Sequence, residues 1–504
     1  MAKQSSSIAV GYLAVLLATA VFYGVSCAPG PVWQDSGLIQ HRVWHRDIEG
    51  SLGLAISHPL YYLVAIGAGC VPLGQFGHRV NLVSSAAGAV AVANLYLVVR
   101  LWLGRDLPAV LAAVTLALSH TFWRHASLAE TYTLWTALFL GEMIVLLQYT
   151  KGKRVGYLYL LGLLNGLAIA VHMLAVIPLA CYAVFVLVLA AGRSIRARHV
   201  LIMAGLWVLG ALPLEYLIAR NILAGGDLFG TLASVAFGDR WRGDVLNAHL
   251  SWRIIKENLL FAVLNFPTPN ALLLLAGLHA LGRTGARAFR VMVLALLVLF
   301  FVFAFRYTIP DRYAFFIPFY SLVAVLIGLG VHEMQSRFSG RTLAILLGAF
   351  ALLPIPAYAA GPSLARQMDL ALGTRGDIPY RDDYQYFLRP WKTGYTGAER
   401  FATEALEAVE RGAIICADTT TVGPLLYVQE VNGVRPDVEV VTGIARTPGS
   451  PRITALTIDD LLERSPVYVV SVRQEYCPRF ILDRYELAEA GLLWRVIAPL
   501  GEGG

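Results

Sequence analysis

Apolar segments follow one another along the first 360 residues of the chain and are separated by short polar linkers. A helix of about 20 apolar residues crosses the hydrocarbon core of a membrane, so the pattern predicts about eleven membrane helices. The divisions within 156–191 and within 258–281 are the least defined, because an apolar run does not mark its own ends. The predicted helices cover residues 8–28, 78–99, 107–120, 131–149, 156–173, 174–191, 200–219, 258–281, 290–305, 314–331 and 342–360.

The first apolar segment is interpreted as a retained helix rather than a signal peptide. Lys3 is a weak basic start for a signal sequence, and "YGVSCAPG" has no small-x-small cleavage site.

The pattern changes at residue 361, and the rest of the chain is patterned like a soluble protein. Residues 397–412 form an amphipathic pattern that stops at Gly412, as a helix does. Residues 413–421 are a buried strand that runs into a polar turn, "VGPLLYVQEVNG" is a short helix, and "DVEVVTG" and "PVYVVSV" are further strands. We therefore predict a membrane module at 1–360 and a small α/β domain at 361–504.

Composition agrees with a membrane protein and charge gives its orientation. Hydrophobic residues make up 57% of the chain and charged residues 14%. Basic residues collect in alternate linkers that hold few acids, which predicts that these linkers and the N-terminus face the cytoplasm. Residues 29–77, 120–130, 220–257, 306–313 and everything after 361 then lie outside. The net charge of +7 is mostly this topology signal and argues little for nucleic acid.

The first outer loop, 29–77, is long and holds the densest charge of the outer face. Its stretch "VWQDSGLIQHRVWHRDIEG" places Asp35 about seven residues beyond the first membrane helix. Apolar residues flank His58-Pro59, which predicts a helix that lies at the interface or re-enters the membrane.

Three further groups on the outer side are candidates for chemistry. Glu130 in "HTFWRHASLAETYTL" is either a helix cap or a functional carboxylate, and Arg124 precedes it on the adjoining turn. In "RYTIPDRYAFFIP", Arg306 and Arg312 either pair with Asp311 or bind a phosphate, which guanidinium groups contact in a bidentate manner.

The third of these groups is His172 in "NGLAIAVHMLAVIP", which is either a hydrogen-bonded core residue or part of a site.

Motifs for metals and nucleotides are missing from the sequence. It contains no HExxH, no CxxC pair, no DxD cluster, no P-loop and no GxGxxG on the inner side, so we expect no metal site and no nucleotide-driven reaction. Of the five cysteines, Cys416 and Cys477 lie in the predicted outer domain, where a disulfide and free thiols are both open alternatives.

Several segments, in the same order, together resemble a known family. These are "WQDSG", "SHPLYY", "FWRHASLAETYTL", "GLAIAVHM", "YTIPDRYAFFIP" and the tail that begins "YRDDYQYF". The set is similar to the DUF2723-type membrane glycosyltransferases of the GT-C superfamily, which include the animal O-mannosyltransferases that modify plexins. The resemblance implies a polytopic GT-C fold and transfer of a sugar from a polyprenyl-phosphate carrier on the outer side.

The resemblance also implies residue roles. Asp35 corresponds to the catalytic base, Glu130 and Tyr132 to the Glu-x-Tyr stretch, and His172 to the histidine of the following helix. Leu38 stands where the family's DSGE motif has its acid, which puts metal assistance in doubt. His58-Pro59-Leu60 shortens the family's His-Pro-Pro-Gly stretch.

The chemistry of such a transfer suits these residues. A polyprenyl phosphate is a good leaving group, so the protein must deprotonate an acceptor hydroxyl and stabilise the departing phosphate. We predict Asp35 and Glu130 as catalytic residues, and Trp33, Tyr132 and His172 as substrate contacts. The predicted phosphate ligands are Arg306, Arg312, Arg124 and His58.

The lipid-linked sugar is a co-substrate, and no separate cofactor is expected. The acceptor is a protein, a lipid or a glycan. We predict a bacterial-type inner membrane, with the site and the C-terminal domain on the outer side.

Two other classes of function stay open. A secondary transporter would explain the helices and the intramembrane Glu142 and Glu215, and it predicts inverted repeats and broken helices. An envelope assembly or sensor protein with an α/β receptor domain predicts no dependence on Asp35.

Overall fold

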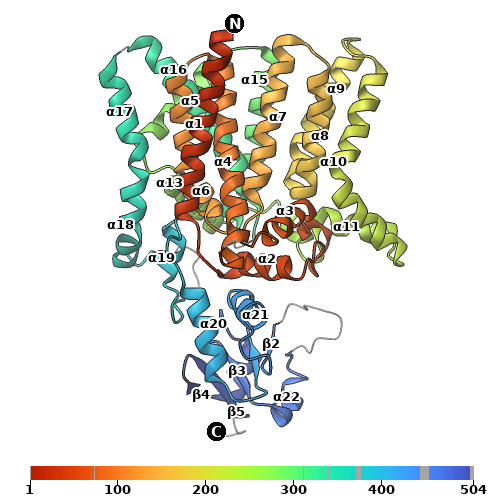
Figure 1. Cartoon of the computed structure of the whole chain (residues 1–504), viewed down its shortest axis with the longest axis vertical. Helices are drawn as coiled ribbons and strands as arrows, with labels where there is room; N and C mark the ends of the chain where they lie inside the picture. Colours follow the sequence, from red (N-terminus) through yellow and green to blue (C-terminus); the bar gives the residue numbers. More distant parts are fainter. Residues whose placement is uncertain are drawn as a thin grey trace.

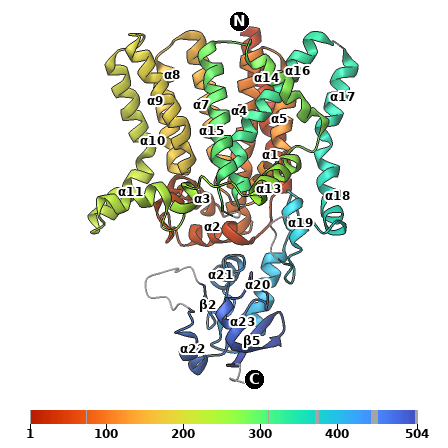
Figure 2. The same cartoon turned by 180° about the vertical axis from the view of Figure 1, so that it is seen from behind.

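The chain forms a helical bundle that stands on a small α/β domain (Figure 1). The computed structural model describes residues 2–72, 74–309, 311–338, 340–370, 376–442 and 453–499. The N-terminus lies at the far end of the bundle, and the C-terminal domain lies beyond the opposite end (Figures 1 and 2).

The bundle helices run roughly along one direction and alternate in sense (Figures 1 and 2). Basic linkers such as 193–198 and 283–290 therefore lie at the end where the chain begins, away from the C-terminal domain. The helices are α1 (Ala2–Ser26), α4 (Phe76–Leu103), α5 (Asp106–Ala117), α7 (Tyr132–Gly152), α8 (Gly156–Val171), α9 (Val176–Ala191), α10 (Ala197–Leu223), α14 (Leu273–Leu281), α15 (Arg287–Arg306), α16 (Ile317–Arg337), α17 (Arg341–Leu352) and α18 (Pro354–Gln367).

The predicted polytopic α-helical fold is confirmed, with a smaller number of complete spans. In the described part of the chain, 8 helices are long and apolar enough to cross a membrane, or up to 10 if each bent pair is one span. The bent pairs are 106–126, which turns by 69°, and 252–281, which turns by 115°. The remaining predicted segment is α8, whose 16 residues fall short of a full span.

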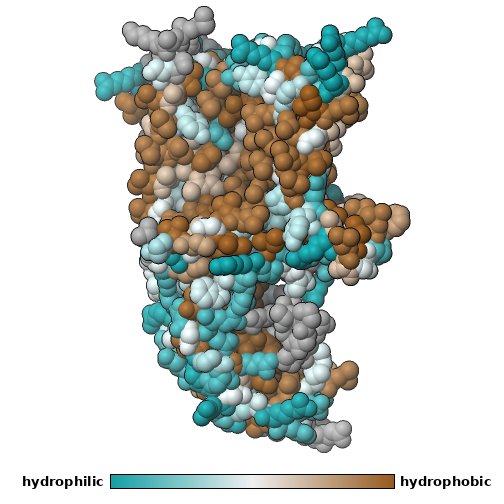
Figure 3. Space-filling model, turned by 45° about the vertical axis from the view of Figure 1, so that its right-hand side comes forward, coloured by the Kyte–Doolittle hydropathy of each residue, from teal (hydrophilic) through white to brown (hydrophobic). Residues whose placement is uncertain are grey.

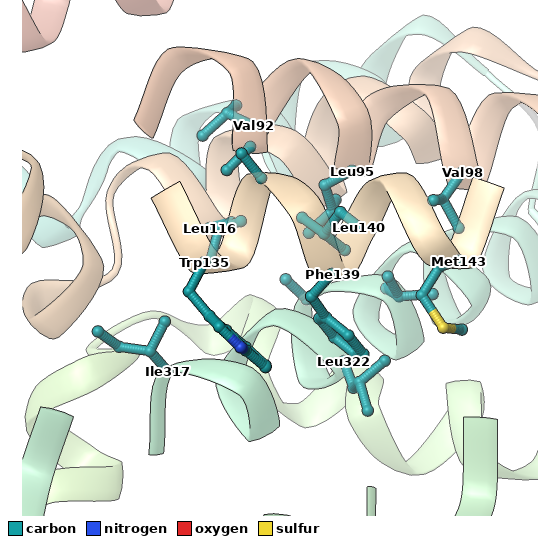
Figure 4. Packing of buried hydrophobic residues seen from close by; sticks show 14 of the residues in the cluster. Val92, Leu95, Val98, Leu116, Trp135, Phe139, Leu140, Met143, Ile317 and Leu322 are labelled. Atoms are coloured by element: carbon teal, nitrogen blue, oxygen red, sulfur yellow. The ribbon is translucent and has the colours of Figure 1, made fainter. Parts of the chain in front are cut away.

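The bundle core is built around α4, α7 and α16. The apolar stretch at Arg312–Arg337 is 89% buried, whereas that of α1 is only 6% buried and faces outward. Trp135 and Phe139 of α7 stack against each other and point toward α16, as Figure 4 shows. The outer surface of the bundle is a broad apolar band with polar residues at its two ends (Figure 3), as a bilayer requires.

Short helices gather at the end of the bundle that faces the C-terminal domain (Figures 1 and 2). The long first outer loop supplies three of them, and the one after His58 is the predicted interfacial helix. They comprise α2 (Gln34–Trp44), η1 (Leu54–Ile56), α3 (Pro59–Gly69), α6 (His120–Ala126), η2 (Met173–Ala175), α11 (Leu228–Phe237), α12 (Arg242–Val245), α13 (Trp252–Asn265), η4 (Arg312–Phe316) and α19 (Asp383–Leu388). The short η3 (Pro269–Leu272) lies within the bundle, where Asn270 donates to the Leu347 carbonyl of α17.

The C-terminal domain is a five-stranded sheet with short helices, in the order β2-β1-β3-β5-β4. β1 is parallel to β2 and β3, whereas β5 is antiparallel to β3 and β4. The pattern predicted the first three strands but not the final hairpin. The elements are α20 (Gly397–Ala408), β1 (Ile414–Cys416), α21 (Val422–Glu430), β2 (Glu439–Val441), α22 (Ile458–Arg464), β3 (Val467–Val469), α23 (Arg479–Arg484), β4 (Tyr485–Ala490) and β5 (Leu493–Pro499).

The two cysteines of this domain are free thiols in the structure. Cys416 and Cys477 are both buried in one apolar cluster. Burial raises the pKa of each thiol to about 12, so neither is a reactive thiolate at neutral pH.

Candidate active site

Helix α2 brings Asp35 to the junction between the bundle and the C-terminal domain. Asp35 lies in the first turn of α2, where a carboxylate is favoured by the helix dipole. Gln34 just before it adopts a left-handed conformation with φ of 62°, and its N–H donates to the Thr420 carbonyl at 3.0 Å. A strained residue therefore sets the start of this helix, and a contact with the C-terminal domain holds it.

Ser36 joins α2 to Glu130. Its Oγ donates to Glu130 Oε1 at 2.9 Å. Ser84 of α4 fixes the backbone of Glu130, because its Oγ accepts from the Glu130 N–H at 2.8 Å and donates to the Glu130 carbonyl at 2.8 Å. Helix α7 begins two residues later without a side-chain cap. Glu130 therefore belongs to the junction with α2 and does not cap α7.

Three carboxyl groups influence one another at this junction. Burial and the charge of Asp35 raise the pKa of Glu130 to about 8, while Arg124 and the Ser36 hydrogen bond act in the opposite direction. Burial and the charge of Asp35 also raise the pKa of Asp311. Like charges this close share protons, so near neutral pH the group holds at least one carboxylic acid.

Arg124 of α6 is the buried cation that faces these carboxyl groups. Its Nη1 donates to the Tyr313 hydroxyl at 2.9 Å, and its guanidinium lies over the rings of Tyr313 and Tyr386 at 5.7 and 5.4 Å. It favours the ionised forms of Glu130 and Asp311. Of the four predicted phosphate ligands, Arg124 is the cation placed beside the carboxyl groups.

His58 and His172 stack on each other, and Tyr132 contacts His172. The ring centroids are 4.9 Å apart for the histidine pair and 5.1 Å for His172 and Tyr132. His58 Nδ1 donates to the Val171 carbonyl at 2.7 Å, whereas His172 Nδ1 accepts from the Leu174 N–H at 3.1 Å. Burial lowers the pKa of His58 to about 4 and that of His172 strongly, so both rings are neutral at pH 7. His58 can therefore offer a hydrogen bond but no charge.

The structure gives Arg306 and Arg312 partners within the chain. Arg312 pairs with Glu257, and its Nε donates to Asn258 Oδ1 at 3.1 Å. Arg306 Nη1 donates to the carbonyls of Val245 and Asn247, each at 2.6 Å. Both arginines thus hold the segment 245–258. The structure gives them these partners in place of the ion pair with Asp311 that was one of the two interpretations of the sequence.

Trp33 is buried in the apolar core of the C-terminal domain. Its Nε1 donates to the Tyr395 hydroxyl, and its ring lies 5.3 Å from Phe401. This placement anchors the start of α2 to the domain. Tyr132, by contrast, lies among the rings of His125, His172 and Phe315 beside Glu130.

A second set of basic residues was not predicted from the sequence. Lys392 is buried, and its pKa is lowered strongly by burial and by Arg124, Arg381 and Arg389. Within the described residues, Nε of Arg124 and Nε of Arg389 are buried without a hydrogen-bond partner. The signal in the sequence is "RPWKTGY", in which basic and aromatic residues alternate next to α19. The sequence pattern predicts Asp311 only as an ion-pair partner of Arg306 and Arg312, and not as a member of the carboxyl group cluster.

Part of the chain matches a family model. Residues 51–194 match the model described as the Protein O-mannosyl-transferase TMEM260 N-terminal domain. This segment contains His58, Arg124, Glu130, Tyr132 and His172, and it ends before the predicted phosphate-binding arginines of 306–312.

The whole chain shares its fold with a solved structure, that of ArnT from Cupriavidus metallidurans bound to undecaprenyl phosphate. The TM-score is 0.59 at 13% sequence identity, and the likeness covers 97% of this chain and 98% of that chain. At this identity the likeness establishes the fold.

The fold and the matched segment confirm the resemblance seen in the sequence. The chain is a multi-pass membrane protein with the fold of the ArnT structure, and its residues 51–194 are similar to a protein O-mannosyl-transferase domain.

Proposed function

We propose that this protein transfers a sugar, of the mannose type, from a polyprenyl-phosphate carrier to an acceptor hydroxyl at the outer face of the membrane. The observation that carries the proposal is the junction of Asp35, Glu130 and Asp311 with the buried Arg124 at one end of an apolar bundle. The family of the matched segment and the undecaprenyl phosphate in the ArnT structure support this donor class.

Asp35 acts as the general base. Its carboxylate takes the proton of the acceptor hydroxyl while the acceptor oxygen bonds to the anomeric carbon, and the bond from that carbon to the carrier phosphate breaks. Glu130, with a pKa near 8, is largely protonated at neutral pH. Negative charge is thereby concentrated on the neighbouring Asp35. The hydrogen bond from Ser36 holds Glu130 next to the turn of α2 that carries Asp35.

Arg124 stabilises the departing phosphate. It is a buried cation near the junction, and its Nε has a free donor direction. Lys392 lies nearby, but burial and the neighbouring arginines lower its pKa and so oppose its positive charge. A phosphate in a site with little water gains more from such charges than it does in bulk water. Arg312 contributes less in this scheme because Glu257 already compensates its charge.

The reaction needs no resident cofactor, because the lipid-linked sugar is already activated. Leu38, which replaces the acid of the family's DSGE motif, is partly buried and packs against the core of the C-terminal domain. The site thus uses this position for packing. We therefore propose a mechanism with Asp35 as the single base.

The active face lies outside the cytoplasm, in a bacterial-type inner membrane. The basic linkers at the other end of the bundle support this orientation. The C-terminal domain, which touches α2 directly, is placed to receive the acceptor, whether that is a protein, a lipid or a glycan.

Mass spectrometry of membrane glycoconjugates tests this function. Cells with the active protein are compared with cells that lack it and with cells that carry Asp35→Asn. A hexose-bearing protein, lipid or glycan that is missing from both altered strains would support the proposal. Identical glycoconjugates in all three strains, with unchanged consumption of polyprenyl-phosphate sugars, would refute it.

A further inference from the structure

Helix α2 lies against α21 of the C-terminal domain, and two glycines allow the close approach. A Cβ added to Gly37 would lie 3.1 Å from Pro424 Cδ, and one added to Gly423 would lie 2.6 Å from the Gly37 carbonyl carbon. The two helices pack side by side (Figure 1), with Gly37 against Gly423 at one end of the contact and His41 against Glu430 at the other. Residues one and two turns along α2 therefore meet the end of α21.

Three potential metal ligands converge at that end. His41 and His45 are four residues apart on α2, so they share one face of the helix. His41 Nε2 lies 2.8 Å from Glu430 Oε2, and His45 Nε2 contacts the same oxygen. All three ligand atoms lie within 4.8 Å of one another, and the imidazole centroids are 4.5 Å apart.

We propose that His41, His45 and Glu430 form a binding site for a divalent transition-metal ion of the zinc class. Zinc binds imidazole nitrogen and carboxylate oxygen at about 2.0–2.2 Å, which requires tetrahedral ligand atoms roughly 3.3–3.5 Å apart. The contacts of the two imidazoles with Glu430 Oε2 are shorter than this spacing, so the ligand atoms would move slightly apart around the ion. The pair of histidines at i and i+4 on a helix is a ligand arrangement that zinc sites use repeatedly.

The chemistry of the ligands selects the ion. Two imidazoles and one carboxylate favour zinc and similar transition metals, whereas magnesium and calcium prefer oxygen ligands throughout. The side chains of His41, Glu430 and His45 are 11%, 27% and 49% exposed. The graded exposure gives the ion a path from solvent and leaves a fourth position for water.

The bound ion links the C-terminal domain to the helix that carries Asp35. Two ligands belong to α2 and the third to α21, so binding closes a contact between segments that are 385 residues apart, counted from His45 to Glu430. This role is separate from the sugar transfer, since the three ligands lie beyond the turn of Asp35. The site was missed in the sequence because its third ligand is so distant in the chain.

Zinc binding by the full-length protein tests the proposal. The protein is purified in detergent without a polyhistidine tag, loaded with excess Zn²⁺ and dialysed to remove unbound metal, and its zinc content is measured by inductively coupled plasma mass spectrometry. Zinc affinity is measured by calorimetric titration of the metal-free protein. We expect one tightly held zinc per chain and a higher unfolding temperature with zinc than with chelator. Mg²⁺ in the same titration should give neither effect.

Variants separate a built site from incidental surface binding. His45→Ala and Glu430→Gln should each weaken zinc binding about 100-fold or more, because each removes a direct ligand. His45 is half exposed, so its removal leaves the fold intact. His249→Ala, which removes an exposed histidine elsewhere, is the matched control and should bind zinc as the parent does. Absence of stoichiometric zinc, or equal affinity in His45→Ala and the parent, would overturn the proposal.

Discussion

At the scale of single residues, the proposed mechanism depends on neighbouring carboxyl groups that differ in their surroundings. Asp35 lies exposed at a helix start, whereas Glu130 and Asp311 are half-buried and have raised pKa values. Ser36 and Arg124 both favour ionised Glu130, yet burial outweighs them. The pH dependence of transfer therefore reports on Glu130 as well as on the base.

The rate of transfer should fall as pH rises through about 8. Ionised Glu130 would add a negative charge beside the carrier phosphate, and its pKa is about 8. Ser36→Ala removes a hydrogen bond that lowers this pKa, so the fall should move to higher pH. Values of kcat/KM for the lipid-linked donor, measured between pH 6 and 10, give the pH at which the rate falls. Glu130→Gln should show no such fall, and a fall that persists in Glu130→Gln would assign it to another group.

Glu130→Gln should also raise stability at high pH. The pKa of Glu130 is raised from its usual value to about 8, so the folded state holds the proton more tightly than the unfolded chain does. Wild-type stability therefore drops as pH rises from about 4.5 to about 8, whereas glutamine does not titrate. We expect a gain of the order of 1–2 kcal/mol at pH 8.5, because Glu130 is partly exposed, and almost none at pH 4.5. Unfolding midpoints at the two pH values check this, and an equal gain at both would contradict it.

At the scale of elements, the contact between α2 and α21 sets the position of the site. The apolar pattern predicted the bundle helices because each must satisfy its own backbone in lipid. Helix α21 was also visible in the sequence. The contact between α2 and α21 could not be predicted, because Gly37 and Gly423 reveal a close approach only once both helices are placed in space.

Gly37→Ala should disturb the start of α2 and, through it, the contact of α2 with the C-terminal domain. Its Cβ would lie 2.3 Å from the Val32 carbonyl oxygen, and 3.1 Å from Pro424 Cδ, so one of these must move. We expect a loss of about 2 kcal/mol or more in stability and a large drop in transfer. Gly67→Ala on α3 has nothing within 4 Å of the new Cβ and is the control. Its stability should stay equal or rise by about 1 kcal/mol. A Gly37→Ala protein as stable and active as the Gly67→Ala protein would refute the role of this contact.

At the scale of the whole molecule, the sequence pattern predicted the two-part architecture but only part of the site. Asp35, Glu130, Arg124, His58, His172 and Tyr132 meet at one end of the bundle. Arg306 and Arg312 lie near it but are engaged with residues 245–258. The place of Lys392 and Asp311 at the site could not be predicted from the sequence, because it depends on burial and on neighbours from distant segments.

The buried Glu142 distinguishes a transferase from a transporter. It accepts hydrogen bonds from Tyr182 at 3.0 Å and Asn165 at 3.2 Å within the bundle. Glutamine keeps the shape and the hydrogen-bonding capacity, so Glu142→Gln should transfer sugar within about twofold of the parent rate. A coupled transporter that moves protons through this carboxylate would lose activity with the same change. Sugar transfer and vesicle uptake, measured on the same preparation, decide between the two.

The most direct test of the account is turnover by purified Asp35→Asn. The parent, Asp35→Asn and Asp47→Asn are reconstituted in vesicles with a polyprenyl-phosphate sugar and a membrane extract as acceptor, and release of polyprenyl phosphate is followed by mass spectrometry. Asp47 is in the same loop, and asparagine there can still accept from the N–H groups of Glu49 and Gly50. We predict that Asp35→Asn binds the donor but loses turnover by about 1,000-fold or more, while Asp47→Asn matches the parent. Parent-like turnover by Asp35→Asn would contradict the central claim.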